Sequence, residues 1–271
     1  MTVRCLVGLY GLNRSMRWTA ASIKRKILTP LRNAKAQVLC FAHFNEPGII
    51  NSDHSGEKDI QITRQGLSQM SFEKILFEPQ SEARLPSSAL AAIDALPPGS
   101  RIEPRQTMVN LLFQLHSLDR LWGLVEQSAG KHDVFFFLRP DLEYLDAIRP
   151  ETIFRQINEQ GVDLITASWD QWGGLNDRFA FCSQKGAKAF ARRIHMVPRF
   201  CEENGYLQAE DLLRSVAAWS DLKLAYTNLR AMRVRADGGT IREDFRLSPA
   251  VLARGMARKR IHRLRTILKG P

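Results

Sequence analysis

The chain has 271 residues, of which 44% are hydrophobic, and a formal net charge of +11. This length accommodates one large α/β domain or two small ones, and the apolar content supports a full hydrophobic core. No apolar run reaches the roughly 18–20 residues of a membrane-spanning helix, and the apolar segment 3–9 predicts a first strand rather than a signal peptide. Four cysteines without a C-x-x-C pair argue against a zinc ribbon or a disulfide scaffold and favour a reducing cytoplasm.

The positive charge is concentrated at the two ends of the chain. No acidic residue occurs in 1–45 or after Asp244, whereas both stretches carry many arginines and lysines. Such basic ends indicate polyanionic partners: nucleotide phosphates, anionic lipid or nucleic acid. The alternative is a solvated basic surface that only keeps the protein soluble.

Strand and helix patterns alternate along the chain. In order, we expect strand 3–9, helix 15–31, strand 37–41, a long polar loop over 45–66, strand 72–77, helices 87–96 and 105–127, strand 134–138, helix 150–159, strands 164–168 and 179–182, helices 185–195 and 209–218, and strands 222–227 and 232–235. This order predicts an α/β fold with a mostly parallel central sheet flanked by helices. We expect one domain over 1–247, with a nucleotide-binding front half and a substrate-binding back half.

The segment 248–271 predicts a C-terminal basic amphipathic helix. From Leu252 onward apolar residues recur at steps of three and four, with arginines and lysines between them. This pattern suits an anionic membrane surface, where each basic residue contributes roughly 1 kcal/mol at most. The alternative is that the apolar stripe packs on the domain while the arginines face water. The membrane interpretation makes the protein cytoplasmic and peripheral at the inner membrane.

A buried strand that ends in charge marks the first candidate site. The run Val134–Leu138 is apolar throughout, which suits the centre of a sheet covered on both faces. Pro140 then ends the strand between Arg139 and Asp141, because proline cannot donate to a sheet ladder. Ligands of open α/β sheets bind at the carboxyl ends of strands. The alternative is a strand cap with a surface ion pair.

The turn after the first strand is the second candidate. Gly8 and Gly11 allow backbone to approach a ligand, and Arg14 and Ser15 open the following helix. A helix N-terminus favours phosphate, and an arginine adds a bidentate partner. The pattern matches neither the Rossmann nor the Walker A motif, and an ordinary strand-to-helix turn is the alternative.

The third candidate is the segment 169–181, in which aromatic residues flank glycines and polar groups. Its candidate substrate-binding residues are Trp172, Gly173, Gly174, Asn176, Asp177 and Arg178. A tryptophan can stack on a sugar ring, and polar groups among aromatics are costly to bury without a hydrogen bond or a ligand. The alternative is an Asp–Arg pair that only ties down a loop.

Two acids, Glu210 and Asp211, open the helix expected over 209–218. Either could be a general base, or both could simply complement the helix dipole. The six histidines are scattered without metal-ligand spacing.

Several of these segments together resemble bacterial and viral glycosyltransferase-like proteins of surface-polysaccharide synthesis. The segments are VGLYGLNRS at 7–15, the helix 105–122, RPDL at 139–142 and GGLNDRFAF at 173–181. The resemblance spans roughly residues 3–220. It implies a GT-A-like fold, a nucleotide-sugar donor and a surface-glycan acceptor, either a polysaccharide or a lipid-linked glycan.

The resemblance also implies roles for single residues. GT-A enzymes usually hold a metal and the donor diphosphate with a D-x-D motif; here Arg139-Pro140-Asp141 stands in that place. Only Asp141 can be carried over, so dependence on a divalent metal, Mn or Mg, is left open, and Arg139 could neutralise diphosphate instead. Glu210-Asp211 is similar to the acidic pair from which inverting enzymes draw their base, with Asp211 the first candidate.

The sequence therefore predicts a cytoplasmic glycosyltransferase, with Gly8, Gly11, Arg14, Ser15, Arg139 and Asp141 at the donor. One rival is a sulfotransferase-like enzyme, suggested by the segment GLNRS at 11–15. The other is a non-catalytic protein that binds nucleic acid or another polyanion. Nucleic acid is disfavoured as a partner because no basic-aromatic stacking motif or helix-turn-helix pattern is present.

Overall fold

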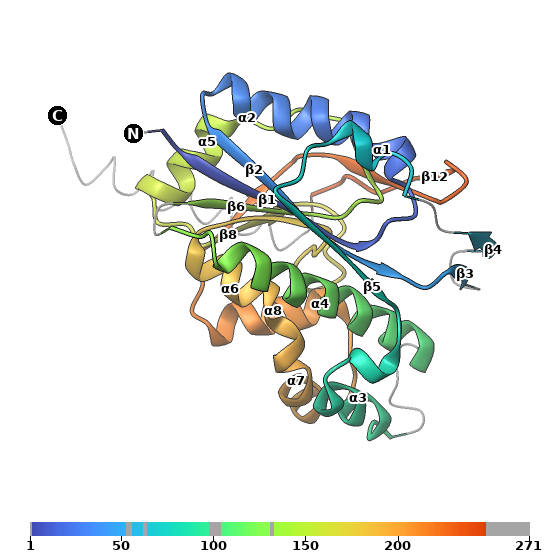
Figure 1. The fold of residues 1–271 in the computed structure, drawn as a ribbon. Coiled ribbons are helices and arrows are strands. Elements are labelled where there is room, and N and C mark those ends of the chain that lie inside the picture. The colour runs from blue at the N-terminus through green and yellow to red at the C-terminus, as the bar shows by residue number, and fades with distance from the viewer. Residues whose placement is uncertain (1, 53–55, 62–63, 98–103, 131–132, 248–271) are drawn as a thin grey trace, which may run out of the picture.

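The computed structural model describes residues 2–52, 56–61, 64–97, 104–130 and 133–247. Its centre is a seven-stranded sheet in the order β10-β8-β9-β6-β1-β2-β5 (Figure 1). The strands are β1 (Arg4–Leu12), β2 (Gln37–Glu46), β5 (Lys74–Pro79), β6 (Val134–Leu138), β8 (Leu164–Ala167), β9 (Phe179–Cys182) and β10 (Leu224–Thr227). β9 runs antiparallel to β6 and β8, and the other neighbouring strands are parallel. The predicted α/β class, with a mostly parallel central sheet, is confirmed.

Helices cover both faces of this sheet (Figure 1). On one face, α1 (Met16–Ile23) continues through a π-helical turn, Lys24–Leu28, into α2 (Thr29–Asn33), beside α5 (Pro150–Phe154) and its π-helical continuation Arg155–Glu159. On the other face lie α4 (Arg105–Glu126), α6 (Gln184–Ala191) and α8 (Ala209–Trp219), with α3 (Ser87–Asp94) and α7 (Val197–Asn204) packed outside α4 and α8. Short 3-10 turns occur at Leu67–Gln69, Glu82–Arg84 and Arg193–Met196.

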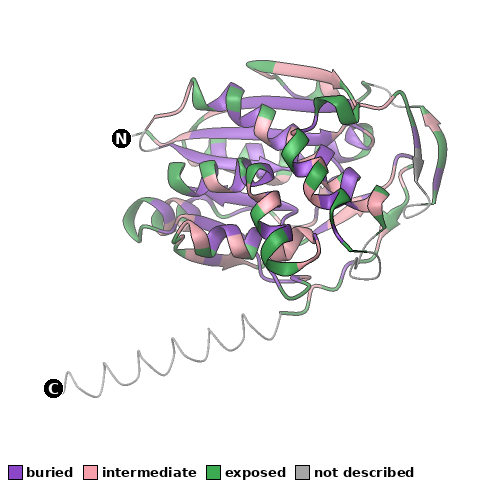
Figure 2. Cartoon of the chain, turned by 90° about the horizontal axis from the view of Figure 1, so that it is seen from below, coloured by how far each residue is buried: buried purple, intermediate pink, exposed green. Residues whose placement is uncertain are grey.

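The side chains of β6 are buried on both faces of the sheet, as its unbroken apolar sequence predicts. Phe136 belongs to the apolar cluster under α1 and α5, whereas Phe135 and Phe137 belong to the cluster under α4 and α6. Successive side chains of a strand point to opposite faces, so an unbroken apolar run requires cover on both sides. Figure 2 shows the central strands buried and the outer faces of the helices exposed.

Two small sheets lie beyond the carboxyl ends of the central strands (Figure 1). One contains β7 (Leu142–Tyr144), β11 (Ala231–Val234) and β12 (Thr240–Ile241), and the other is the hairpin of β3 (Ile49–Ser52) and β4 (Glu57–Gln61). The prediction of a loop over 45–66 is therefore wrong for the hairpin, whose second strand is mostly polar. β7, β12 and α7 were not predicted. β7 and β12 are too short to show a period. Proline in the first turn of α7 is compatible with a helix start, so it was a usable signal that the prediction missed.

Among the described residues, no helix is long and apolar enough to cross a membrane. The predicted C-terminal helix over 248–271 lies outside the described residues, so the division of the chain at residue 247 stays a prediction.

Candidate functional site

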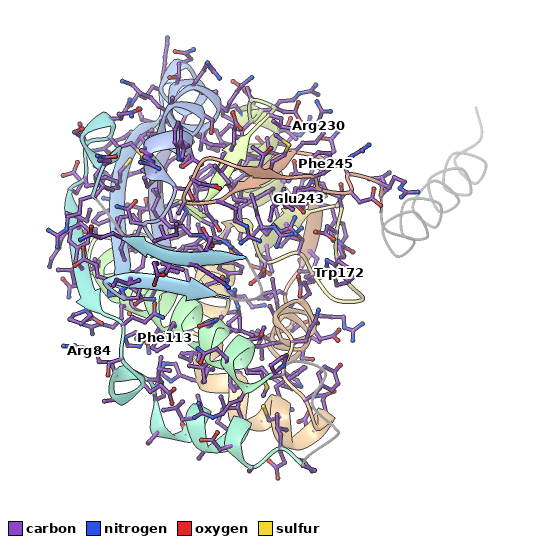
Figure 3. The ribbon with its side chains drawn as sticks, turned by 90° about the vertical axis from the view of Figure 1, so that its right-hand side faces the viewer. Arg84, Phe113, Trp172, Arg230, Glu243 and Phe245 are labelled. Carbon is purple, nitrogen blue, oxygen red and sulfur yellow. The ribbon has the colours of Figure 1, made fainter. Side chains whose placement is uncertain are left out.

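A pocket of about 640 Å³ opens at the carboxyl ends of β1, β2 and β6. It brings together eight of the predicted site residues: Gly11, Arg14, Arg139, Asp141, Trp172, Asp177, Arg178 and Glu210. Other walls come from the N-terminal half of α4, from the β3–β4 hairpin and from the segment after β11. In Figure 3 the hairpin lies between Phe113 of α4 and Glu243, with Trp172 to one side.

The end of β1 delivers Arg14 to this pocket. Gly11 has φ +106, which an L side chain rarely adopts, and its N–H donates to Ser117 Oγ at 2.8 Å. The strand therefore turns at the pocket edge before α1 begins. Arg14 then donates to Asp141 at 2.9 Å and to Glu57 of β4 at 2.8 Å.

Asp141 lies between two guanidinium groups. Arg139 donates to both of its oxygens, at 3.0 and 2.7 Å, and Arg14 donates to one of them. Burial alone would raise the pKa of Asp141, but the charges and hydrogen bonds of Arg139 and Arg14 outweigh it and hold the pKa well below its usual range. Asp141 is thus a carboxylate that fixes two arginines at the wall of the pocket.

The donor set at Asp141 does not fit a divalent metal. Both carboxylate oxygens already accept hydrogen bonds from arginine, and a metal ion would have to approach between two cations. Among the residues that the structure describes, no group of three or more His, Cys, Asp or Glu side chains could hold a metal ion.

The loop between β8 and β9 carries the predicted aromatic and polar residues. Trp172 is exposed at the rim of the pocket, with 71% of its surface open to solvent. Arg178 pairs with Asp170 and with Glu243, the latter at 2.8 Å, and lies over the ring of Trp169. Buried charges therefore tie the loop to the segment after β12, while Trp172 is exposed at the pocket rim.

Asp177 is held from the opposite side. Its carboxylate accepts a hydrogen bond from Gln114 of α4 at 3.1 Å and one from the fully buried Arg193 at 3.1 Å. Asn176 donates to the Trp169 carbonyl and accepts from the Arg178 N–H, so it shapes the loop and does not line the pocket.

The two acids at the start of α8 differ in placement. Glu210 lines the pocket, and burial, followed by the charge of Asp177, raises its pKa to about 8. Asp211 does not line the pocket; its carboxylate accepts from the Tyr206 hydroxyl at 2.8 Å and pairs with Arg214 at 2.8 Å. Of the two predicted candidates for the base, only Glu210 faces the space where a ligand would bind.

Four further predicted residues also lie outside the walls of the pocket. Gly8 packs against α4, and a Cβ at this position would overlap the side chain of Leu121. Ser15 is buried and donates from Oγ to the Val234 carbonyl at 2.6 Å. Gly173 adopts φ +86 in open space, and Gly174 packs on the first turn of α8.

Gly174 packs so closely on α8 that it has no room for a larger side chain. A Cβ on Gly174 would overlap the Glu210 carbonyl, which already accepts the Leu175 N–H at 3.0 Å. We expect Gly174→Ala to destabilise the protein by about 1–3 kcal/mol through overpacking and to displace Glu210. Urea unfolding measures the first effect, and turnover with donor measures the second.

Gly173→Ala is the matched control, because a Cβ there meets nothing within 4 Å and strains only the positive φ. It should cost roughly 1–2 kcal/mol and leave Glu210 in place. Wild-type stability and turnover in Gly174→Ala would contradict the contact as the reason for this glycine.

Sequence reasoning missed part of the pocket wall. Arg233 and Arg235, at the end of β11, both line it, as do Gln106, Asn110 and Gln114 of α4. The arginines are two residues apart in a predicted strand and so lie on one face, which was a usable signal. The amides recur every four residues and therefore share one face of α4.

No protein-family model matches the chain, and no curated protein matches it. Among solved structures, the chain is similar to mouse xyloside xylosyltransferase 1 in its apo form. The TM-score is 0.39 and the identity 12%, over 83% of this chain and 85% of that chain. At this TM-score and identity, function has to be inferred from the residues of the pocket.

Proposed function

We propose that the protein is a glycosyltransferase that moves a sugar from a nucleotide-sugar donor to a glycan acceptor. One observation carries the proposal: the pocket joins an arginine-rich wall at the carboxyl ends of β1 and β6 to the carboxylate of Glu210, whose pKa is raised to about 8. Cations in that place suit a diphosphate. A carboxylate that titrates near neutral pH suits removal of a proton from a hydroxyl.

The proposed reaction follows from this arrangement. The acceptor hydroxyl oxygen attacks the anomeric carbon of the donor sugar, and its proton passes to the carboxylate of Glu210. The bond between the anomeric carbon and the diphosphate oxygen breaks, and its electron pair leaves with the nucleoside diphosphate. Arg14 and Arg139 lie at the wall that would receive this charge, where fixed donors stabilise it most. Attack opposite the leaving group inverts the anomeric centre.

Side chains elsewhere in the pocket wall can bind a sugar through hydrogen bonds and stacking. The side-chain amides of Gln106, Asn110 and Gln114 line one wall and can exchange hydrogen bonds with hydroxyl groups. Trp172 at the rim offers an apolar face on which a sugar ring of the donor or acceptor can stack. Arg178 and Asp177 are proposed to orient substrate from the same side.

Other parts of the functional hypothesis stay proposals. A surface-glycan or lipid-linked acceptor, a cytoplasmic location and attachment to an anionic membrane are supported by the sequence resemblance and by the basic pattern of residues 248–271.

A thermal-shift screen tests the proposal against both rivals. Uridine, guanosine and thymidine diphosphates, adenosine phosphosulfate and an oligonucleotide are each added to the full chain. We expect at least one nucleoside diphosphate to raise Tm. A ligand at a hundred times its Kd stabilises the folded state by about 2.7 kcal/mol. A shift with adenosine phosphosulfate alone would favour a sulfotransferase, and a shift with the oligonucleotide alone a nucleic-acid-binding protein.

A further inference from the structure

Arg235 differs from the other arginines around the pocket in its charge partners. Arg14 and Arg139 have carboxylate oxygens of Asp141 at 2.9 and 2.7 Å. The remaining arginines of the pocket wall, Arg178 and Arg233, pair with Glu243 at 2.8 and 2.7 Å. The carboxylate oxygen paired with Arg235 lies at 3.8 Å, on Glu57.

Glu57 does not neutralise Arg235 well, because it is already engaged. One of its oxygens accepts from Arg14 at 2.8 Å, and the other accepts the Ala236 N–H at 2.9 Å. Among the described residues, no hydrogen bond reaches the Arg235 guanidinium. The three cations Arg14, Arg139 and Arg235 therefore share two carboxylates, Asp141 and Glu57, and the cluster carries a net positive charge.

The backbone holds Arg235 firmly in this place. Its own N–H donates to the Gly239 carbonyl at 2.8 Å, and the next N–H is bound by Glu57. Its side chain is only 16% exposed although it lines the pocket. Burial and the neighbouring charge of Arg14 lower the pKa of Arg235, which indicates a cation that an anionic ligand would stabilise.

We propose that the guanidinium groups of Arg14, Arg139 and Arg235 bind the diphosphate of the donor directly and neutralise it without a divalent metal ion. The inference rests on the proposed function. Asp141 then orients two of the arginines, and Arg235 supplies the positive charge that no carboxylate of the cluster balances. Planar guanidinium groups bind phosphate oxygens bidentately, so they can replace the cation that usually holds a diphosphate.

The test is calorimetric titration of the full chain with pyrophosphate and with uridine and guanosine diphosphates. Each titration is run in EDTA and again with Mn²⁺ or Mg²⁺. We expect a diphosphate to bind in EDTA, with a Kd that changes less than about threefold when metal is added. Arg235→Gln should weaken binding by about tenfold or more, the scale of one charge-assisted hydrogen bond.

Arg230→Gln is the matched control. Arg230 carries the same charge just before β11, but it is exposed and paired with Asp146 at 2.8 Å, away from the pocket. We expect wild-type affinity from this variant.

Binding that requires metal, or unchanged affinity in Arg235→Gln, would overturn this inference and leave the proposed function standing. Absence of diphosphate binding both with and without metal would overturn the two together.

Discussion

Replacement of Glu210 by glutamine is expected to lower kcat by about 10²–10⁴-fold, the range for loss of a general base. Glutamine keeps the size of the side chain but cannot take a proton from the acceptor hydroxyl. Glu210 accepts a hydrogen bond from the Gln208 side chain at 2.7 Å and lies at the pocket wall, so fold and donor affinity should change little. Turnover and donor titration of the same preparation separate the two effects.

The pH dependence gives a second signature of the same group. A base must be ionised to act, and the pKa of Glu210 is raised to about 8. We therefore expect kcat of the wild type to rise with pH by nearly tenfold per unit below pH 7 and to level off above about pH 8. The residual rate of Glu210→Gln should lack this rise.

Asp211→Asn provides the matched control, because it makes the same chemical change one residue along the helix. The Asp211 carboxylate is bound by Tyr206 and Arg214 and does not line the pocket. We expect a small loss of stability and less than about a tenfold loss of kcat. A larger loss in Asp211→Asn than in Glu210→Gln would return the role of base to Asp211.

Asp141→Asn is expected to lose about 3–5 kcal/mol of folding stability, the cost of removing one partner from a buried ion pair. The reason is that Arg14 and Arg139 would stay buried without their shared carboxylate. The sequence alone indicates a mainly catalytic effect for this change, whereas the burial of Asp141 indicates a structural one as well. Urea unfolding near neutral pH measures this loss of folding stability.

The pH dependence of stability follows from the same pair. The folded-state pKa of Asp141 is depressed, so its contribution is present above the unfolded-state pKa of about 3.9 and is lost as pH falls below it. Asp141→Asn should lack that part of the acid sensitivity. Asp146→Asn, at an exposed pair with Arg230, is the control and should cost less than about 1 kcal/mol. Equal stability of the two variants would contradict the role of Asp141.

The central strands could be predicted because burial on both faces leaves a plain pattern. Val134–Leu138 and Phe179–Cys182 form strands over the predicted residues. Their apolar side chains need no partner beyond the helices on either side. The β3–β4 hairpin could not be predicted in this way, because a polar strand over the rim of a pocket lacks the apolar alternation that marks a half-buried strand.

Part of the candidate site could also be predicted, because the order of the strands determines which loops meet. Arg14 follows β1, and Arg139 and Asp141 follow β6. These two strands are parallel neighbours, so the convergence of the three residues follows from topology. Which of Glu210 and Asp211 faces the pocket depends on the rotation of α8, and the pattern of charges does not determine it. Arg235 directly follows β11 of a separate small sheet, whose docking the sequence does not reveal.

The most direct test of the proposed function is release of nucleoside diphosphate from a panel of nucleotide sugars. The full chain is incubated at about pH 8 with each donor and a mixture of glycan acceptors, beside Glu210→Gln. We expect at least one donor to yield nucleoside diphosphate and glycosylated acceptor in equal amounts with the wild type, and about 10²–10⁴-fold more slowly with the variant. Failure of every donor to bind or to react, or equal rates from the two proteins, would contradict a glycosyltransferase that uses Glu210 as its base.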